Sequence, residues 1–195
     1  MFLSLSLSLS LSLSLSVASC PSPLVDANAL DYDAAADGAA YVLAADEEVV
    51  CWWIVDEYHD TRLVHRWLVS DRYPTRIEAL PDGRAVLVMS DLRLQVRHPG
   101  DKSYRNLDLY LPGMPALVLG HGRRDWLAVT VNRDEASALV MLVDIDRERT
   151  LASVALPREN LALSFADGSD AVWVDGAHAL ALDESGISVR GQSPR

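Results

Sequence analysis

The sequence is poor in cysteine, in basic residues and in long apolar runs, and each shortage excludes a class of protein. Only two of the 195 residues are cysteine, Cys20 and Cys51, too few for a disulfide framework and without the paired spacing of a zinc site. The 17 Lys and Arg are outnumbered by 28 Asp and Glu, giving a formal net charge of −11. Such a surface repels phosphate, which argues against nucleic acid as a partner. No run approaches the roughly 18 consecutive apolar residues of a spanning helix.

The composition is that of a single globular domain. Half of the residues are hydrophobic and 23% are charged, a balance that separates the chain from disordered proteins. A length of 195 residues corresponds to about one domain and is enough to bury a sizeable core without cross-links. No window of about twelve residues spaces its apolar positions as a helix would without a Gly, Pro or charge-rich interruption. We therefore expect an all-β chain.

The amino-terminal segment alternates leucine and serine from residue 3 to residue 16. Alternation is typical of a strand with one apolar and one polar face. A stretch of this length that contains only leucine and serine is also typical of a low-complexity segment. The segment ends in VASC at positions 17–20, which resembles the lipobox of bacterial lipoprotein signal peptides. The resemblance implies cleavage before Cys20 and attachment of a diacylglycerol to its sulfur. The Lys or Arg that usually opens such a signal is missing from the first three residues, MFL.

This resemblance divides the chain into a signal peptide over 1–19, a stiff tether over 20–29 that begins with Pro21-Ser22-Pro23, and a domain over 30–195. It implies a lipid-anchored protein of the bacterial cell envelope that faces the periplasm. Pro21, where inner-membrane lipoproteins often carry aspartate, favours the outer membrane. Two alternatives stay open: a different cleaved signal, or a cytoplasmic protein with an artefactual first segment.

An internal repeat organises the rest of the chain. Four stretches align, AADGAAYVLAA, LPDGRAVLVMS, GHGRRDWLAVTV and FADGSDAVWVDG, and their marker glycines are Gly38, Gly83, Gly122 and Gly168, which lie 45, 39 and 46 residues apart. Asp-Gly supplies the positive φ that a tight hairpin turn requires. Each turn is followed by a run rich in Val, Leu, Ala and Trp, the composition of a buried strand.

Each repeat unit has one strand-like run before its turn and three after it, separated by polar turns. The first unit continues as VVCWWIV, DEYHDT and RLVHRWLVS, and the second as LRLQVRH, PGDKS and YRNLDLYL. This predicts four antiparallel meanders of four strands, each the size of a propeller blade. Runs such as VVCWWIV are apolar on both faces, as expected for sheets packed between neighbouring sheets.

The pattern resembles the β-propeller repeat superfamily over about Leu30 to Gly191. The subfamily stays open: Gly120-His121 is similar to the dipeptide of WD40 repeats, but it occurs once and no unit ends in Trp-Asp, and the tryptophan-docking motifs of quinoprotein propellers are absent. The alternative fold is a β-sandwich or barrel. The chain could close alone as a small ring, or two chains could complete a larger one, so the oligomeric state is left open.

Two acidic groups suggest metal binding, but neither has the required spacing. In DYDAAADG the candidates are Asp31, Asp33, Asp37 and Gly38. A calcium loop of the EF-hand type needs its third oxygen ligand two positions before Asp37, and it needs a glutamate at the position of Val42. We therefore interpret this stretch as a solvated turn. The tip DEYHD groups Asp56, Glu57, His59 and Asp60, which match no known ligand pattern. No metal ligand or cofactor-binding residue is assigned.

The same tip is a better candidate for a protein contact. Tyr58 and His59 lie at the tip, and Trp52 and Trp67 are close in sequence; aromatic side chains supply large contact area at low entropic cost. Cys51 is expected to be a buried, unreactive thiol in its strand. Its neighbours Trp52 and Trp53 should point to opposite faces of that strand.

No catalytic residue is assigned, because the five histidines are scattered and no serine has a nucleophile-elbow sequence. We expect a non-enzymatic, lipid-anchored platform that binds a protein partner, possibly a basic one, on its turn-lined face. The resemblance allows an accessory factor for outer-membrane assembly or a toxin-immunity protein. The alternatives are a propeller enzyme, such as a lactonase or dehydrogenase with a metal or quinone at the channel, and a cytoplasmic interaction domain.

Overall fold

The computed structural model describes residues 19–24, 29–35, 37–121, 123–158, 162–165, 172–175, 180–183 and 186–189. Every regular element in these ranges is a β-strand, and none of them contains a helix of the length and apolarity needed to cross a membrane. The leucine-serine segment lies outside the described residues, as do the predicted turn glycines Gly122 and Gly168.

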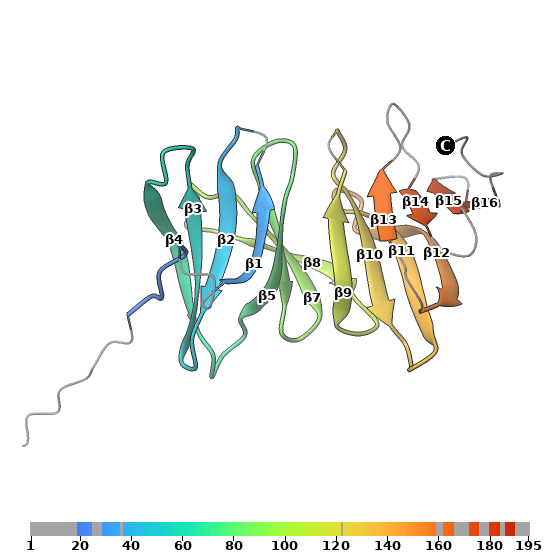
Figure 1. Ribbon diagram of the computed structural model, residues 1–195, viewed down its shortest axis with the longest axis horizontal. Helices are drawn as coiled ribbons and strands as arrows, with labels where there is room; N and C mark the ends of the chain where they lie inside the picture. Colours follow the sequence, from blue (N-terminus) through green and yellow to red (C-terminus); the bar gives the residue numbers. More distant parts are fainter. Residues whose placement is uncertain are drawn as a thin grey trace, which may run out of the picture.

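The strands form four sheets of four strands each (Figure 1). The first sheet contains β1 (Ala29–Ala34), β2 (Ala40–Ala45), β3 (Val49–Val55) and β4 (Thr61–Leu68). The second contains β5 (Pro74–Ala79), β6 (Ala85–Met89), β7 (Arg93–Arg97) and β8 (Arg105–Tyr110). The third contains β9 (Pro115–Gly120), β10 (Trp126–Asn132), β11 (Ser137–Asp144) and β12 (Arg149–Pro157). The fourth contains β13 (Ala162–Phe165), β14 (Val172–Asp175), β15 (Leu180–Asp183) and β16 (Gly186–Val189).

Each sheet is a meander in which successive strands pair antiparallel, and each corresponds to one repeat unit of the sequence. Gly38 and Gly83 occupy their turns with φ of 86° and 84°, the left-handed conformation that the Asp-Gly pairs predict. The prediction of an all-β, β-propeller-like fold built from four-stranded meanders is confirmed.

The sheets pack face to face in chain order, and they form an open row. In Figure 1 the first sheet lies at the left end and the fourth at the right end. Contacts follow the same order: β1 and β2 pack on β5, β5 and β13 each touch β9, and β12 packs on β15 and β16. Within the described part of one chain, the four sheets are therefore arranged as an arc in which the first and last sheets lie apart.

The core consists of three apolar layers, one between each pair of neighbouring sheets. The layer between the first two sheets includes Tyr41, Leu43, Trp52, Ile77 and Leu87. Side chains alternate along a strand, so neighbouring residues serve different layers. Leu87 faces the first sheet, whereas Val86 and Val88 face the third, which is why strands such as AVLVM are apolar on both faces.

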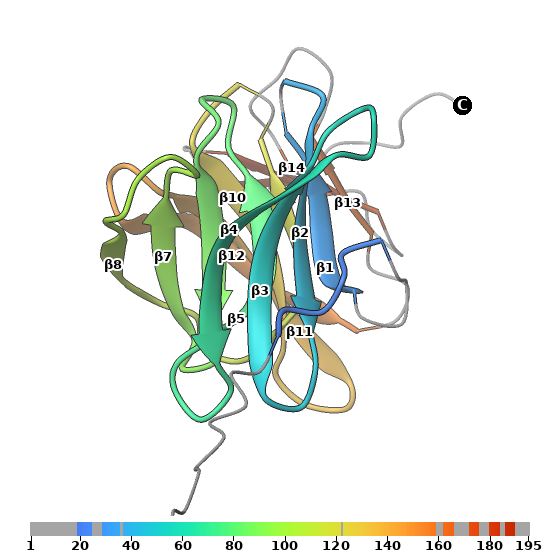
Figure 2. The same cartoon turned by 90° about the vertical axis from the view of Figure 1, so that its left-hand side faces the viewer.

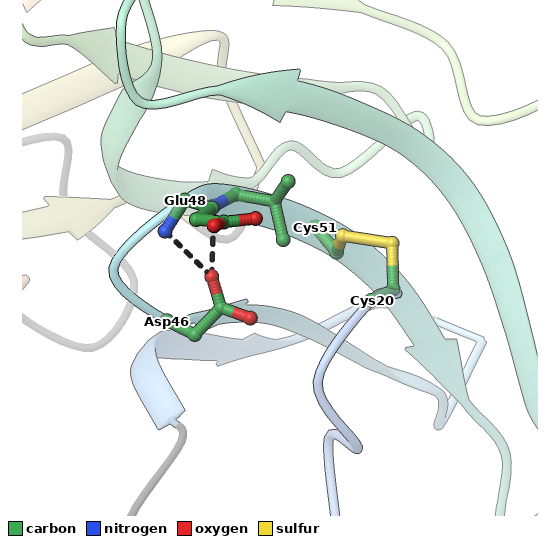
Figure 3. The surroundings of a disulfide bond; sticks show 5 residues. Cys20, Asp46, Glu48 and Cys51 are labelled. Atoms are coloured by element: carbon green, nitrogen blue, oxygen red, sulfur yellow. Dashed lines mark hydrogen bonds between the residues drawn. A yellow bond between two sulfur atoms is a disulfide. The ribbon is translucent and has the colours of Figure 1, made fainter. Parts of the chain in front are cut away.

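A disulfide bond joins Cys20 to Cys51 of β3, with 5.9 Å between their Cα atoms (Figure 3). The adjacent β2–β3 turn is held by Asp46, whose Oδ1 accepts hydrogen bonds from the N–H groups of Glu48 and Val49 at 2.8 Å. The expectation that Cys51 is an unpaired thiol is therefore wrong. The amino-terminal segment crosses one face of the first sheet (Figure 2), and the two sulfur atoms are bonded where it passes β3 (Figure 3).

The disulfide attaches the first residue of the predicted tether, Cys20, to the first sheet. Residues 19–24 lie across β3 and β2 and do not extend away from the domain (Figure 2). One sulfur cannot carry both a disulfide and a thioether, so the lipidation predicted for Cys20 is incompatible with the bond in this structure.

Candidate functional site

The first strand of every sheet lies at one edge of the row, where β1, β5, β9 and β13 are neighbours. We call these the inner strands. A groove of about 410 Å³, the inner groove, lies over β1, β5 and β9. Its lining residues are Leu30, Asp31, Tyr32, Asp33, Arg76, Glu78, Ala116, Leu117, Val118 and Leu119. Three carboxylates and one guanidinium thus share a groove whose remaining walls are mostly apolar.

The carboxylates of β1 are fixed by the backbone of the next sheet. Asp31 Oδ2 accepts a hydrogen bond from the N–H of Ile77 at 2.8 Å, and Asp33 Oδ2 accepts one from the N–H of Ala79 at 2.7 Å. β5 is an edge strand, so alternate N–H groups have no partner in its own sheet. Asp31 and Asp33 are also two residues apart on β1, so their carboxylates accept hydrogen bonds from these N–H groups in place of the carbonyl groups of a further strand.

Glu78 makes the equivalent connection between the second and third sheets. Its Oε1 accepts a hydrogen bond from the N–H of Gly120 at the end of β9. Asp33 and Glu78 each stand five residues before the glycine of their turn, Gly38 and Gly83. This repeated acidic position, in the run that precedes each of the two turns, is the sequence signal for the link.

Burial and mutual repulsion favour the protonated carboxyl groups in the inner groove. Burial raises the pKa of Glu78 to about 8, with further contributions from the charges of Asp33 and Asp31. Burial also raises the pKa of Asp31 and of Asp33, although the nearby Arg76 and the backbone hydrogen bonds oppose this shift for Asp31. A cation placed in the groove would favour the ionised carboxylates.

The structure divides the residues of the rejected calcium motif between two places. Asp37 and Gly38 lie in the β1–β2 turn, where Asp37 Oδ1 accepts a hydrogen bond from the N–H of Ala39 at 3.1 Å. For these two residues the interpretation as a turn is right. Asp31 and Asp33 belong to β1 and line the inner groove. Their interpretation as turn residues is wrong, because the strand begins two residues before Asp31.

The predicted protein-contact residues do not form one surface. Tyr58 is 77% exposed and His59 is exposed in the β3–β4 turn, where Asp56 Oδ1 accepts hydrogen bonds from the N–H groups of Tyr58 and Asp60 at 2.9 Å. Trp67 is half-buried on β4. Trp52 is fully buried between the first two sheets and has no surface to offer, which corrects that assignment.

A second groove of about 510 Å³, the turn groove, lies where turns of the second and third sheets meet. Its lining residues are Pro81, Asp82, Arg123, Arg124, Asp125, Trp126, Asp144, Asp146 and Arg147. Arg84 joins the two sheets beside it, with 2.6 Å between its Nη2 and Asp125 Oδ2 and 3.5 Å to Asp146 Oδ1. The turn groove therefore carries both signs of charge, in contrast to the mainly acidic inner groove.

In the described part of the chain, no three His, Cys, Asp or Glu side chains are arranged so that they could hold a metal ion. The three carboxylates of the inner groove are each directed to a different backbone N–H group, which keeps them from converging on one point.

Comparisons with known proteins bear on the fold. No protein-family model matches the sequence, and no curated protein matches it. Among 14 matching chains of solved structures is a crystal structure of puromycin hydrolase, 17% identical, with a TM-score of 0.55. The match covers 81% of this chain but only 28% of that chain. The chain is thus an all-β protein with a β-propeller-like fold, and it spans less than a third of the length of that hydrolase.

Proposed function

We propose that this chain is a non-enzymatic platform of the cell envelope that binds a basic protein partner through the inner groove. The observation that carries the proposal is the rigid placement of Asp31, Asp33 and Glu78 by backbone hydrogen bonds from neighbouring sheets. Preorganised carboxyl groups lose little conformational entropy when a partner arrives, and a cationic side chain in the groove would favour their ionised form. The net charge of −11 extends the same preference over the molecule and would steer a basic partner toward it.

The walls of the groove suit the side chains of Lys and Arg. Leu117, Val118 and Leu119 line the groove together with the acidic residues, and Leu117 is exposed to solvent. Lys and Arg place their aliphatic stems against apolar surface and keep the charged head near polar groups. An outer-membrane assembly factor and a toxin-immunity protein both act by such stoichiometric binding, and the identity of the partner decides between them.

The test is a pull-down from native membranes with the wild-type chain and with the double variant Asp31→Asn and Asp33→Asn. Asparagine keeps an oxygen that can accept the hydrogen bonds from Ile77 and Ala79 but carries no charge. We expect recovery of the partner to fall by about tenfold and to become less sensitive to salt.

The matched control is the double variant Asp101→Asn and Glu135→Gln, which removes the same number of charges from exposed turns away from the groove. It should retain the partner at the wild-type level. Equal recovery by all three proteins would overturn the inner groove as the binding site.

Export is a separate part of the proposal, and it is supported by the disulfide. Disulfide bonds persist in oxidising compartments such as the periplasm and are rare in the cytoplasm. A lipid anchor at Cys20 would compete for the same sulfur, because the thioether excludes the bond to Cys51.

Mass spectrometry of the mature chain distinguishes these states. A diacylglyceryl group on Cys20 together with a free thiol on Cys51 establishes the anchor. A chain that is two hydrogens lighter than its reduced form, without lipid, establishes an exported protein that lacks the anchor. An unmodified, reduced chain that begins at Met1 would contradict export and favour the cytoplasmic alternative.

A propeller enzyme is the second candidate function. The observation that favours it is the presence of three carboxyl groups in the inner groove, with the pKa of Glu78 raised to about 8. A group that titrates near neutral pH beside other carboxylates is suited to acid–base chemistry. A metal form of this candidate finds no ligand set among the described residues. A hydrolytic activity that is lost in Glu78→Gln, while the fold is kept, would favour the enzyme.

A further inference from the structure

The first sheet has one face against the second sheet and one face at the free end of the row (Figure 1). Along β2 and β3 the side chains on this outer face are nevertheless apolar and buried: Val42, Ala44, Val49, Cys51 and Val55. Between neighbouring sheets of the row, such a face is covered by the next sheet. Here residues 19–24 cross it, so the amino-terminal segment takes the place of a neighbouring sheet (Figure 2).

The disulfide attaches this segment covalently to the first sheet. Pro21 and Pro23 have no backbone N–H, so the segment cannot join the sheet as a strand would. Leu24, its one large aliphatic side chain, is 55% exposed and adds little packing. The bond between Cys20 and Cys51 thus fixes the segment without strand pairing.

Exposed apolar side chains surround the covered area. Tyr32 of β1 is 74% exposed, and Leu63 and Leu68 of β4 are each 44% exposed. Their partners in the sheet are outer-face residues: Val42 for Tyr32, Trp53 for Leu63 and Val49 for Leu68. Removal of residues 19–24 would expose the buried outer-face residues of β2 and β3 next to Tyr32, Leu63 and Leu68. Together they would form one continuous apolar surface, which soluble proteins seldom expose.

We propose that the Cys20–Cys51 disulfide holds residues 19–24 over the outer face of the first sheet. Reduction of this bond by a dithiol uncovers the face while the four sheets stay folded. The thiolate of the reductant attacks the Cys20 sulfur, which is the more accessible one, and the Cys51 thiolate leaves and takes up a proton. The second thiol of the reductant then displaces Cys20. The protein gains two thiols, and the reductant becomes a disulfide.

The first test uses single-cysteine variants of the full chain. Cys20→Ser leaves Cys51 as the only thiol, and Cys51→Ser leaves Cys20 as a matched control; both are treated with a maleimide. In the present structure Cys51 is fully buried. We expect Cys51 in the first variant to react at a rate within about tenfold of that of Cys20 in the second, because the loosened segment opens readily. Reaction of Cys51 only after addition of denaturant would overturn the proposal.

The second test follows the wild-type chain on reduction with dithiothreitol. Binding of anilinonaphthalene sulfonate should rise several-fold while the far-ultraviolet circular dichroism of the sheets is unchanged. A rise in dye binding accompanied by loss of the strand signal would also overturn the proposal, because the disulfide would then hold the fold together and not only the segment. The Cys20→Ser variant should bind the dye without reductant and show no further change with it.

Discussion

Replacement of Trp52 by alanine is expected to lower the free energy of unfolding by about 3–5 kcal/mol. The side chain is fully buried between the first two sheets, where its ring meets that of Tyr41 edge to face with centroids 5.6 Å apart. Alanine would leave a large cavity in a layer of strands that cannot close on it without breaking their pairing. Chemical denaturation followed by circular dichroism measures the loss.

Two comparison variants separate packing from other effects. Trp52→Phe keeps most of the ring volume and removes a buried indole N–H that has no hydrogen-bond partner, so its cost should be below about 1.5 kcal/mol. Tyr58→Ala, at an exposed turn, should change stability by no more than about 0.5 kcal/mol. A Trp52→Ala variant as stable as Tyr58→Ala would contradict the packed layer.

Replacement of Glu78 by glutamine is expected to remove a large pH dependence of stability. The pKa of Glu78 is about 8 in the folded chain against 4.5 for an ordinary glutamate. The folded state therefore binds a proton that the unfolded state releases, and stability is full below pH 4.5 and is lost as the pH rises to about 8. The slope for one such group is about 1.4 kcal/mol per pH unit.

Glutamine imitates the protonated carboxyl group, because its oxygen can still accept the hydrogen bond from Gly120. Denaturation midpoints measured from pH 5 to pH 9 should thus fall more steeply for the wild-type chain than for Glu78→Gln. The exposed Glu135→Gln serves as control and should follow the wild-type chain. Parallel curves for the wild-type chain and Glu78→Gln would show that Glu78 titrates normally.

The repeat in the sequence was sufficient to predict the sheets, because each meander is local. Marker turns such as those at Gly38 and Gly83 set where strands begin, and strands adjacent in sequence pair with each other. The opposite directions of Trp52 and Trp53 followed from the two-residue period of a strand. Trp52 was nevertheless misassigned as a contact residue, since the sequence does not say which face of an apolar strand meets another sheet.

The inner groove and the disulfide could not be predicted in the same way, because both depend on contacts between units. Asp31 accepts a hydrogen bond from a residue 46 positions away, and the Gly120 N–H reaches Glu78 across 42 positions. The pairing of Cys20 with Cys51 depends on the path of the amino-terminal segment across the first sheet. The lipobox-like residues predicted lipidation of Cys20, and no local sequence pattern indicated a disulfide instead.

The chain-ordered row also has a consequence for biosynthesis. Every strand pair forms between segments that leave the ribosome one after the other, so the sheets can fold in succession from the amino terminus. Cys51 belongs to the first of these units, and Cys20 precedes it by only 31 positions. Oxidation can therefore be complete while the later three units are still being translated or translocated.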